Sequence, residues 1–463
     1  MIPDLFTELP PVRDALVTET SKQQDKTADL CLSYLAGDSG EQLLEYNEHG
    51  VPRLRRDSHV RFLHKSLGPL PAGFMAADAS RPWFLYWALS ALVILGEDVS
   101  HYREAVAETA RAMQNDSGGF GGGGRQLSHL ATTYAIVLSI ALVGDEDAYE
   151  VIDRKAMWRW LCSLKQTDGG FQLGLGGEED IRGAYCAAVI ITLLNIPLEL
   201  TPESPAWKED GSATLFTGLA GYVRRCQTFE GGISGQPDVE AHGAYAFCAL
   251  GCLALLDHPR RIIPRYLNVP RLVSWMSSRQ YAPEGGFSGR TNKLVDGCYS
   301  HWVGGCFPLI EACLSPVDED KKGGTAAAAA ASKLPPAPES LFSREGLIRY
   351  ILCCCQDTSK RGGLRDKPGK LSDAYHSCYV LSGLSSAQHQ WELAPSEETS
   401  PATGRADPVW RVMPYLEDND ENDVQIFDQK DRLRPIHPVY AIPIQSQEAI
   451  RDYFLVVDGL KKL

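Results

Sequence analysis

Residues 114–120, with the sequence QNDSGGF, begin a pattern that returns four more times along the chain. In each copy a glutamine is followed within a few residues by a glycine pair and an apolar residue. The pairs stand at 118–119, 169–170, 231–232, 285–286 and 362–363, and the glutamines are Gln114, Gln166, Gln227, Gln280 and Gln356. Because glycine adopts positive φ at no steric cost, each pair predicts a tight turn that the chain reuses.

The segments on either side of each turn predict two kinds of helix. The segment before a turn, such as MWRWLCSL at 157–164, mixes apolar and charged residues and predicts an outer helix. The segment after a turn is apolar all round and predicts a buried inner helix. A sixth inner helix begins near Arg81, before the first turn. We therefore predict an all-α protein, an α6–α6 barrel of six outer–inner helix pairs. An open superhelix of the same pairs is the alternative.

The repeat also divides the chain. We expect residues 71–395 to form the barrel, residues 1–70 to be an N-terminal extension, and residues 396–463 to be a C-terminal extension that packs on or near the barrel. A charged, Ala- and Pro-rich insert at 317–339 interrupts the barrel and lengthens the last interval between turns.

Composition excludes several classes of protein. A net charge of −14 argues against a general nucleic-acid binder, which needs a basic surface. The first residues have neither a basic start nor an apolar core, so they do not predict a signal peptide. The apolar stretch at 83–96 is too short to cross a bilayer, so we expect no stable membrane insertion. The 13 cysteines lie mostly in apolar helical segments, which predicts buried, reduced thiols and a cytoplasmic protein.

Residue types with metal-ligand chemistry fall at the start of two neighbouring inner helices. Asp296 and Cys298 precede one helix, and His376 opens the next. One oxygen, one sulfur and one nitrogen leave a fourth zinc position open, which is the pattern of catalytic zinc sites. Arg182, His242, Cys298 and His376 all open inner helices, so we expect them at equivalent positions around one mouth of the barrel. A surface aspartate, a core cysteine and a hydrogen-bonded histidine are the alternative interpretation.

Basic and hydrogen-bonding residues surround this set. An open-site zinc activates a thiol, because the ion stabilises the thiolate nucleophile. Arg290 and Lys293 precede the metal loop, Tyr299 follows Cys298, and His242 lies one repeat earlier. Two cations, an imidazole and a phenol at one mouth suit a diphosphate. Ordinary surface charge is the alternative for each residue taken alone.

Aromatic residues recur in the inner helices. Trp83, Trp87, Tyr245, Trp302 and Tyr379 are expected to face inward. Core packing is the usual role of such residues. Side chains alone do not fill the axis of a six-helix barrel, so we expect an aromatic-lined cavity.

Several long segments resemble the protein prenyltransferase β subunits, and farnesyltransferases most closely. They are RPWFLYW at 81–87, DIRGAYCAA at 180–188, EGGFSGRTNKLVDGCYSHW at 284–302, DKPGKLSDAYHSCYVLSGLS at 366–385 and HPVY at 437–440. The resemblance implies transfer of farnesyl from farnesyl diphosphate to the cysteine thiol of a C-terminal C-a-a-X motif, as in small GTPases. It also implies an obligate heterodimer with a helical-repeat α subunit.

The same resemblance assigns residues. It implies zinc on Asp296, Cys298 and His376 and the diphosphate on His242, Arg290, Lys293 and Tyr299. It places the isoprenoid along Arg182, Tyr245, Cys248 and Trp302, and the peptide and the length gauge at Trp83, Trp87, Tyr375 and Tyr379. Asp366 matches a carboxylate that assists magnesium beside the diphosphate. Ala244 and His301 depart from the family, which usually has glycine and an aromatic residue there.

Three other functions remain as alternatives. A type I geranylgeranyltransferase β subunit shares the zinc and diphosphate residues. A terpene cyclase uses a similar barrel but needs an Asp-rich or D-x-D-D motif, and the sequence contains neither. A non-enzymatic α/α repeat scaffold would need no zinc.

Overall fold

A computed structural model describes residues 2–9, 15–37, 45–315, 340–394, 409–414 and 425–457. The insert expected at 317–339 lies outside the described residues, as does the start of the expected C-terminal extension at 396–408. The division into a barrel and two extensions stays a prediction.

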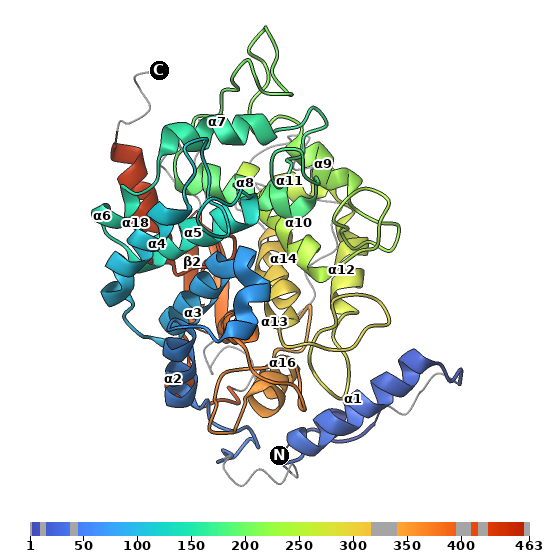
Figure 1. The fold of residues 1–463 in the computed structure, drawn as a ribbon. Helices are drawn as coiled ribbons and strands as arrows, with labels where there is room; N and C mark the ends of the chain where they lie inside the picture. The colour runs from blue at the N-terminus through green and yellow to red at the C-terminus, as the bar shows by residue number, and fades with distance from the viewer. Residues whose placement is uncertain are drawn as a thin grey trace.

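Six inner segments form a closed ring (Figure 1). They are α3 (Arg81–Leu95), α5 (Leu130–Val143), α8 (Ile181–Leu193), α10 (Gly243–Leu256), α13 (Tyr299–Trp302) with α14 (Phe307–Leu314), and α17 (Ala374–Gln388). Each packs on the next, and α17 packs on α3, which closes the ring. The barrel is therefore confirmed and the open superhelix is excluded.

The fifth inner segment is broken into two helices. A 3₁₀ turn at Gly304–Cys306 separates α13 from α14, and Pro308 stands in the first turn of α14. Proline has no N–H to donate to the carbonyl four residues earlier, so a continuous helix loses a bond at this point. The break leaves α13 as a short helix directly after Cys298.

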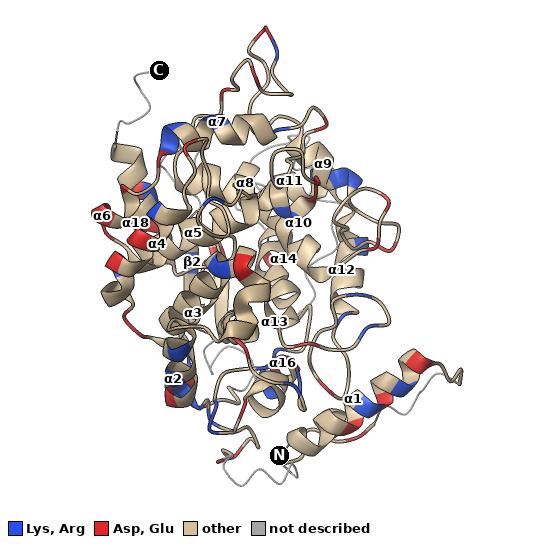
Figure 2. Cartoon of the chain, in the orientation of Figure 1, with Lys and Arg blue, Asp and Glu red and all other residues tan. Residues whose placement is uncertain are grey.

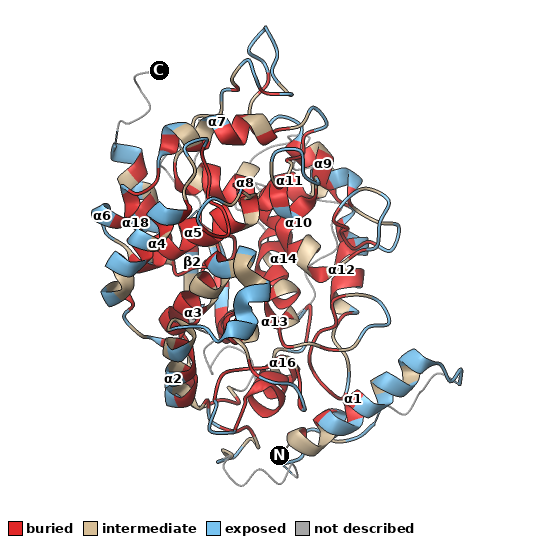
Figure 3. Ribbon diagram, in the orientation of Figure 1, coloured by how far each residue is buried: buried red, intermediate tan, exposed pale blue. Residues whose placement is uncertain are grey.

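The outer layer carries most of the charge. Its helices are α2 (Arg56–Ser66), α4 (Arg103–Met113), α7 (Arg154–Leu164), α9 (Leu219–Arg225), α12 (Val269–Ser277), and α16 (Arg344–Arg349) with a π-helical turn at Tyr350–Cys355. Charged residues colour these helices and the loops in Figure 2, whereas the inner helices are mostly tan there and buried in Figure 3. Helix α2 packs on α3 and so belongs to the outer layer.

The glycine pairs close the outer layer. A Cβ added to Gly118 would lie 2.2 Å from the carbonyl oxygen of Ala156, at the start of the next outer helix. The first glycines of the pairs at 169, 231 and 285 approach the following outer helix in the same way. A Cβ on Gly362 would lie 2.4 Å from the carbonyl oxygen of Ser58 in α2, so the last turn reaches back to the first helix of the ring. Only glycine permits this approach together with its positive φ.

The repeat glutamines fasten each turn to the next helix start. Gln114 donates to the Val151 carbonyl at 2.8 Å and accepts from the Asp153 N–H at 2.9 Å. Gln227, Gln280 and Gln356 make matching pairs of bonds.

In the second turn, Lys165 rather than Gln166 occupies the position of the repeat glutamine. Lys165 pairs with Phe171 there, as Gln114 pairs with Phe120. The two pairs have the same spacing in the sequence, and Gln166 lies one residue too late. Its side chain donates instead to the Leu164 carbonyl of its own segment.

The C-terminal region contacts the barrel interior. The Tyr185 hydroxyl donates to the Val439 carbonyl at 2.6 Å, and the Tyr86 hydroxyl donates to the Ala441 carbonyl at 3.2 Å. The HPVY segment thus forms part of the wall around the barrel axis. Helix α18 (Ile444–Val456) packs on α5 and α8.

The remaining elements are peripheral. A hairpin of β1 (His389–Ala394) and β2 (Val409–Pro414) pairs antiparallel from His389↔Pro414 to Ala394↔Val409, a small addition to the all-α fold. The other helices are α1 (Glu19–Leu35), which reaches away from the barrel in Figure 1, α6 (Glu146–Tyr149) and α11 (Pro259–Tyr266). Short 3₁₀ turns lie at Asp4–Phe6, Ala72–Ser80, Ser100–Tyr102 and Gln429–Asp431.

Candidate metal centre and active site

A capping residue stands at one equivalent position before each of five inner segments. These residues are His129, Asp180, His242, Asp296 and Asp373, and the side chain of each accepts a backbone N–H two or three residues later. Such acceptors satisfy N–H groups that have no partner in the first turn of a helix.

The expected equivalence of Arg182, His242, Cys298 and His376 was therefore wrong. Only His242 occupies the capping position. Arg182 and Cys298 stand two residues after it and His376 three residues after it. Contacts still join their repeats in sequence. The Arg182 guanidinium lies 5.9 Å from the ring of Tyr245, His242 is hydrogen-bonded to Tyr299, and Cys298 lies close to His376.

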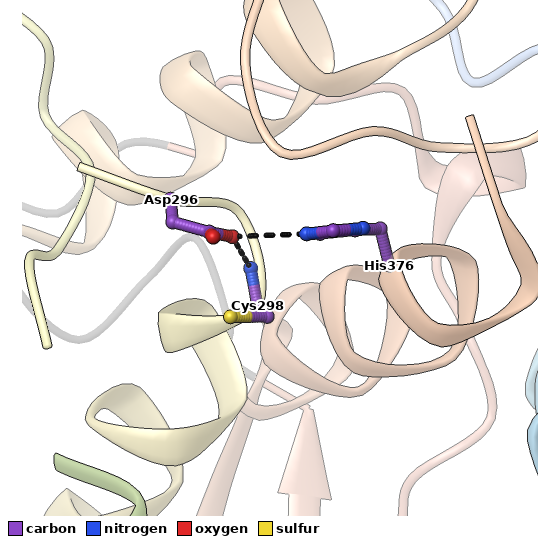
Figure 4. Close-up of side chains that lie close together, drawn as sticks. All are labelled: Asp296, Cys298 and His376. Carbon is purple, nitrogen blue, oxygen red and sulfur yellow. Dashed lines mark hydrogen bonds and ion pairs between the residues drawn. The ribbon is translucent and has the colours of Figure 1, made fainter. Parts of the chain in front are cut away.

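Asp296, Cys298 and His376 converge, as Figure 4 shows. Their ligand atoms all lie within 4.8 Å of one another. Asp296 and Cys298 come from the loop before α13, and His376 points toward the Asp296 carboxylate from the first turn of α17. His376 Nε2 lies 3.3 Å from Asp296 Oδ1 but makes no well-directed hydrogen bond, although it is buried. A buried nitrogen lone pair without a donor is what a metal ligand offers.

The electrostatics of the three residues favour a bound cation. Burial and the Asp296 carboxylate raise the pKa of the Cys298 thiol well above its usual range, so the thiolate needs a positive ion to form. Burial alone would lower the pKa of His376, but the negative charges of Asp296 and Asp373 outweigh burial and raise it, so the imidazole favours a positive charge between the two carboxylates. The donor set of one oxygen, one sulfur and one nitrogen fits zinc with an open fourth position.

We call Asp296, Cys298 and His376 the metal-type set. Asp373 supports this set, and the sequence analysis missed it. Its Oδ2 lies 2.7 Å from His376 Nδ1, and its Oδ1 accepts the His376 N–H at 2.7 Å. A carboxylate only accepts, so the ring proton sits on Nδ1 and Nε2 is left as the ligand atom.

His242 and Tyr299 form a second pair at the mouth. His242 Nδ1 accepts the Ala244 N–H at 3.1 Å, so the ring proton sits on Nε2 and is donated to the Tyr299 oxygen at 3.1 Å. Burial and the nearby Arg290 and Arg182 lower the pKa of His242 to about 4, which keeps the imidazole neutral. Tyr299 therefore keeps its own hydroxyl proton for another acceptor.

The two expected diphosphate cations differ in their surroundings. Arg290 forms an ion pair with Glu240 at 2.8 Å and is partly exposed. Lys293 is exposed. Thr291, between them, donates to Glu230 at 3.1 Å, and the indole N–H of Trp275 binds the same carboxylate. These bonds hold the loop on which both cations lie.

Asp366 lies beside the metal loop. Its carbonyl oxygen accepts the Gly297 N–H at 2.8 Å, between Asp296 and Cys298. Both of its carboxylate oxygens contact the ammonium of Lys367.

An unbroken series of aromatic contacts surrounds the barrel axis. The series runs Trp83, Tyr134, Tyr185, Phe247, Trp302, Tyr379, Tyr375, Trp87 and back to Trp83, with neighbouring ring centroids 4.5–5.9 Å apart. All six inner segments contribute to this aromatic belt. Helix α3 contributes Trp83 and Trp87, α17 contributes Tyr375 and Tyr379, and each of the other four contributes one residue. Tyr134, Tyr185 and Phe247 were absent from the expected set. Cys248 is buried beside this belt in α10.

Among the described residues, no helix has both the length and the apolar character that a membrane crossing needs.

The matching family model and the relatives by sequence agree on one family. The model of the prenyltransferase alpha-alpha toroid domain matches residues 54–442. The protein farnesyltransferase subunit beta of Pyricularia oryzae is 62% identical over 99% of this chain and 85% of its own length. That of Schizosaccharomyces pombe is 37% identical over 96% of this chain and 99% of its own. The solved structure of Candida albicans protein geranylgeranyltransferase-I complexed with GGPP shares the fold, with a TM-score of 0.61 at 19% identity, covering 87% of this chain and 99% of that one.

Proposed function

The chain belongs to the protein prenyltransferases as a β subunit of the farnesyltransferase type, and from this premise we propose that its barrel mouth transfers farnesyl to a cysteine thiol at a zinc site. The observation that carries the proposal is the convergence of Asp296, Cys298 and His376, whose ligand atoms lie within 4.8 Å of one another. A zinc ion held there would lower the pKa of an acceptor thiol and keep it as the thiolate.

The protein's own residues would position the reactants and receive the leaving group. The acceptor sulfur attacks C1 of farnesyl diphosphate, the C–S bond forms, and the C1–O bond breaks with its electrons going to the diphosphate. Arg290 and Lys293 would neutralise that charge, and the free hydroxyl proton of Tyr299 would be donated to a phosphate oxygen. His242 orients Tyr299 through their 3.1 Å hydrogen bond.

The aromatic belt suits an isoprenoid chain. Its rings provide an apolar wall within the barrel, next to the mouth that carries the charged residues. We assign the isoprenoid to Arg182, Tyr245, Cys248 and Trp302, and the acceptor peptide and the length gauge to Trp83, Trp87, Tyr375 and Tyr379. Asp366, beside the metal loop, is assigned to magnesium bound with the diphosphate.

The partner is proposed to be a prenyltransferase α subunit. Large apolar side chains are exposed in the loops between the glycine turns and the inner helices, at Leu127 (88%), Leu175 (74%), Val239 (48%) and Leu371 (74%). The loop with Arg290 has the same place in its repeat. Repeated apolar groups around a mouth fit a protein surface that covers it. Both relatives are named as a subunit beta, which agrees with such a partner.

We further propose that the enzyme works in the cytoplasm on proteins with a C-a-a-X end, such as small GTPases. All 13 cysteines are free and buried, which suits a reducing compartment.

The test uses this chain co-expressed with its α subunit. Zinc per heterodimer and farnesyl transfer to a C-a-a-X peptide are measured for the wild type, Cys298→Ala and the control Cys378→Ala, which removes a buried cysteine two residues after His376. We expect one zinc and transfer for the wild type and the control, and neither for Cys298→Ala. Full zinc content and rate in Cys298→Ala would refute the site. A preference for geranylgeranyl diphosphate would favour the type I geranylgeranyltransferase alternative.

A further inference from the structure

The carboxylate of Asp366, which is assigned above to magnesium, is already bound by the ammonium of Lys367. Lys367 Nζ lies 2.6 Å from Asp366 Oδ2 and also contacts Oδ1. The ammonium thus bridges both carboxylate oxygens. The two side chains are largely buried, with exposed fractions of 11% for Lys367 and 16% for Asp366. Such an ion pair is screened much less than one at the surface.

The surroundings of Asp366 favour a cation next to its carboxylate. Burial and the Asp296 carboxylate raise the pKa of Asp366, while Lys367 opposes them. The Asp366 backbone is fixed by hydrogen bonds from the Gly297 N–H and the Tyr350 hydroxyl, at 2.8 and 2.9 Å. These bonds keep the Asp366 backbone beside the loop that carries Asp296, and the ammonium of Lys367 favours the ionised form of the carboxylate there.

We propose that Lys367 is an internal cation that competes with magnesium for Asp366 and so sets the magnesium concentration at which the enzyme works. The inference rests on the proposed function and deepens it. Magnesium must displace the ammonium from both oxygens before it reaches them, so the affinity measured for the metal is lower than that of a free carboxylate. Loss of the ammonium would consequently tighten metal binding, although a positive charge next to a diphosphate is removed.

The same loop supplies a matched control. Lys370 lies three residues after Lys367 and is exposed. Its substitution removes the same formal charge from the loop but leaves the Asp366–Lys367 pair in place. A general electrostatic effect would therefore alter metal binding in both variants, whereas competition for Asp366 would alter it only in the variant of Lys367.

The experiment measures cation binding rather than turnover. Heterodimers carrying Lys367→Met, Lys370→Met or Lys367→Arg are loaded with a farnesyl diphosphate analogue that cannot be cleaved, and free Mn²⁺ is followed by electron paramagnetic resonance. We expect Lys367→Met to lower the Mn²⁺ dissociation constant by about fivefold or more, in the range of ordinary coupling between ligands. Lys370→Met and Lys367→Arg should stay close to the wild type, and all should keep one zinc.

Several outcomes overturn the inference. An unchanged or weaker dissociation constant in Lys367→Met does so, as does an equal drop in Lys370→Met. If Lys367→Met does not assemble, Lys367→Gln replaces it and is judged by the same criteria. If the wild type transfers farnesyl but Lys367→Met has the same Mn²⁺ dissociation constant, only the role of Lys367 is refuted. A wild type without zinc and without transfer refutes the proposed function itself.

Discussion

His376 Nδ1 and Asp373 Oδ2 lie 2.7 Å apart, three residues from each other in the first turn of α17. This hydrogen bond fixes the tautomer that leaves Nε2 free for a metal. We expect Asp373→Asn to lower zinc affinity by about 10–100-fold, because the negative charge beside His376 Nδ1 is lost while an amide oxygen can still cap the helix. A chelator-competition titration measures the affinity.

Asp153 provides the control for this change. Its carboxylate caps α7 by accepting the Ala156 N–H at 2.9 Å, and no histidine is hydrogen-bonded to it there. Asp153→Asn should leave zinc affinity unchanged. Equal affinities in Asp373→Asn and the wild type would show that Asp373 serves only as a cap.

Arg290 and Lys293 are expected to bind the diphosphate. Each Ala substitution should weaken farnesyl diphosphate binding by about 1.5–3 kcal/mol, the worth of a charge-assisted hydrogen bond, while zinc stays bound. Equilibrium binding of a fluorescent isoprenoid diphosphate measures this loss. Unchanged affinity in both variants would place the diphosphate elsewhere.

Substitution of Glu240 should have the opposite effect on diphosphate affinity from substitution of Arg290 or Lys293. It holds Arg290 in an ion pair at 2.8 Å, which the diphosphate has to replace. Glu240→Gln removes that competitor, so the diphosphate should bind as tightly as in the wild type or more tightly. Weaker binding would mean that Glu240 positions Arg290 rather than competing for it.

The repeat predicted the barrel well, but not the contacts that depend on helix phase. Tyr134, Tyr185 and Phe247 read as ordinary core residues, and which of them faces the axis depends on where each inner helix begins. Helix α2 was missed because no glycine pair follows it. The metal-type set was recognisable from its residue types, whereas Asp373 resembles any aspartate that caps a helix.

Lys165 gives a prediction for stability against pH. It is fully buried, its Nζ donates to the Gly169 carbonyl at 2.7 Å, and it lies 4.6 Å from the Phe171 ring centroid. Burial lowers its pKa to about 7, and the nearby Asp168, Glu179 and Cys252 only partly oppose this. Because the folded pKa is below the unfolded one, the unfolded chain binds more protons between about pH 7 and 10, and this residue's contribution to stability rises with pH in that window.

Replacing Lys165 with glutamine, the residue found in the other turns, should remove this pH dependence of stability. Lys165→Gln should raise the melting temperature of the heterodimer relative to the wild type at pH 6.5, and the difference should shrink toward pH 9.5, about the range over which such a lysine loses its proton. Thermal unfolding across this pH range tests the trend. Lys155→Gln, at an exposed position in α7, should show no such trend. If the difference in melting temperature between Lys165→Gln and the wild type is the same at every pH, burial of the ammonium does not destabilise the protein at neutral pH.

Trp83 is expected to set the length of the isoprenoid. Its indole stacks on Trp87 with centroids 5.6 Å apart, and it is only partly buried. Tyr379, bulky as well, lies in the same belt on α17. By resemblance, these positions form the floor in farnesyltransferases, and geranylgeranyl enzymes have a smaller residue at the first. Five extra carbons would have to displace the indole, and such overpacking costs about 1–3 kcal/mol.

The wild type should therefore prefer the fifteen-carbon diphosphate, and Trp83→Thr should shift the preference toward the twenty-carbon one. Competition between the two diphosphates measures the ratio of kcat/KM values. Trp158→Thr is the control, since it makes the same substitution in the outer helix α7, where the indole N–H donates to the Glu199 carbonyl at 2.9 Å. A wild type that already prefers the longer substrate, or a ratio that Trp83→Thr leaves unchanged, would place the length gauge at another residue.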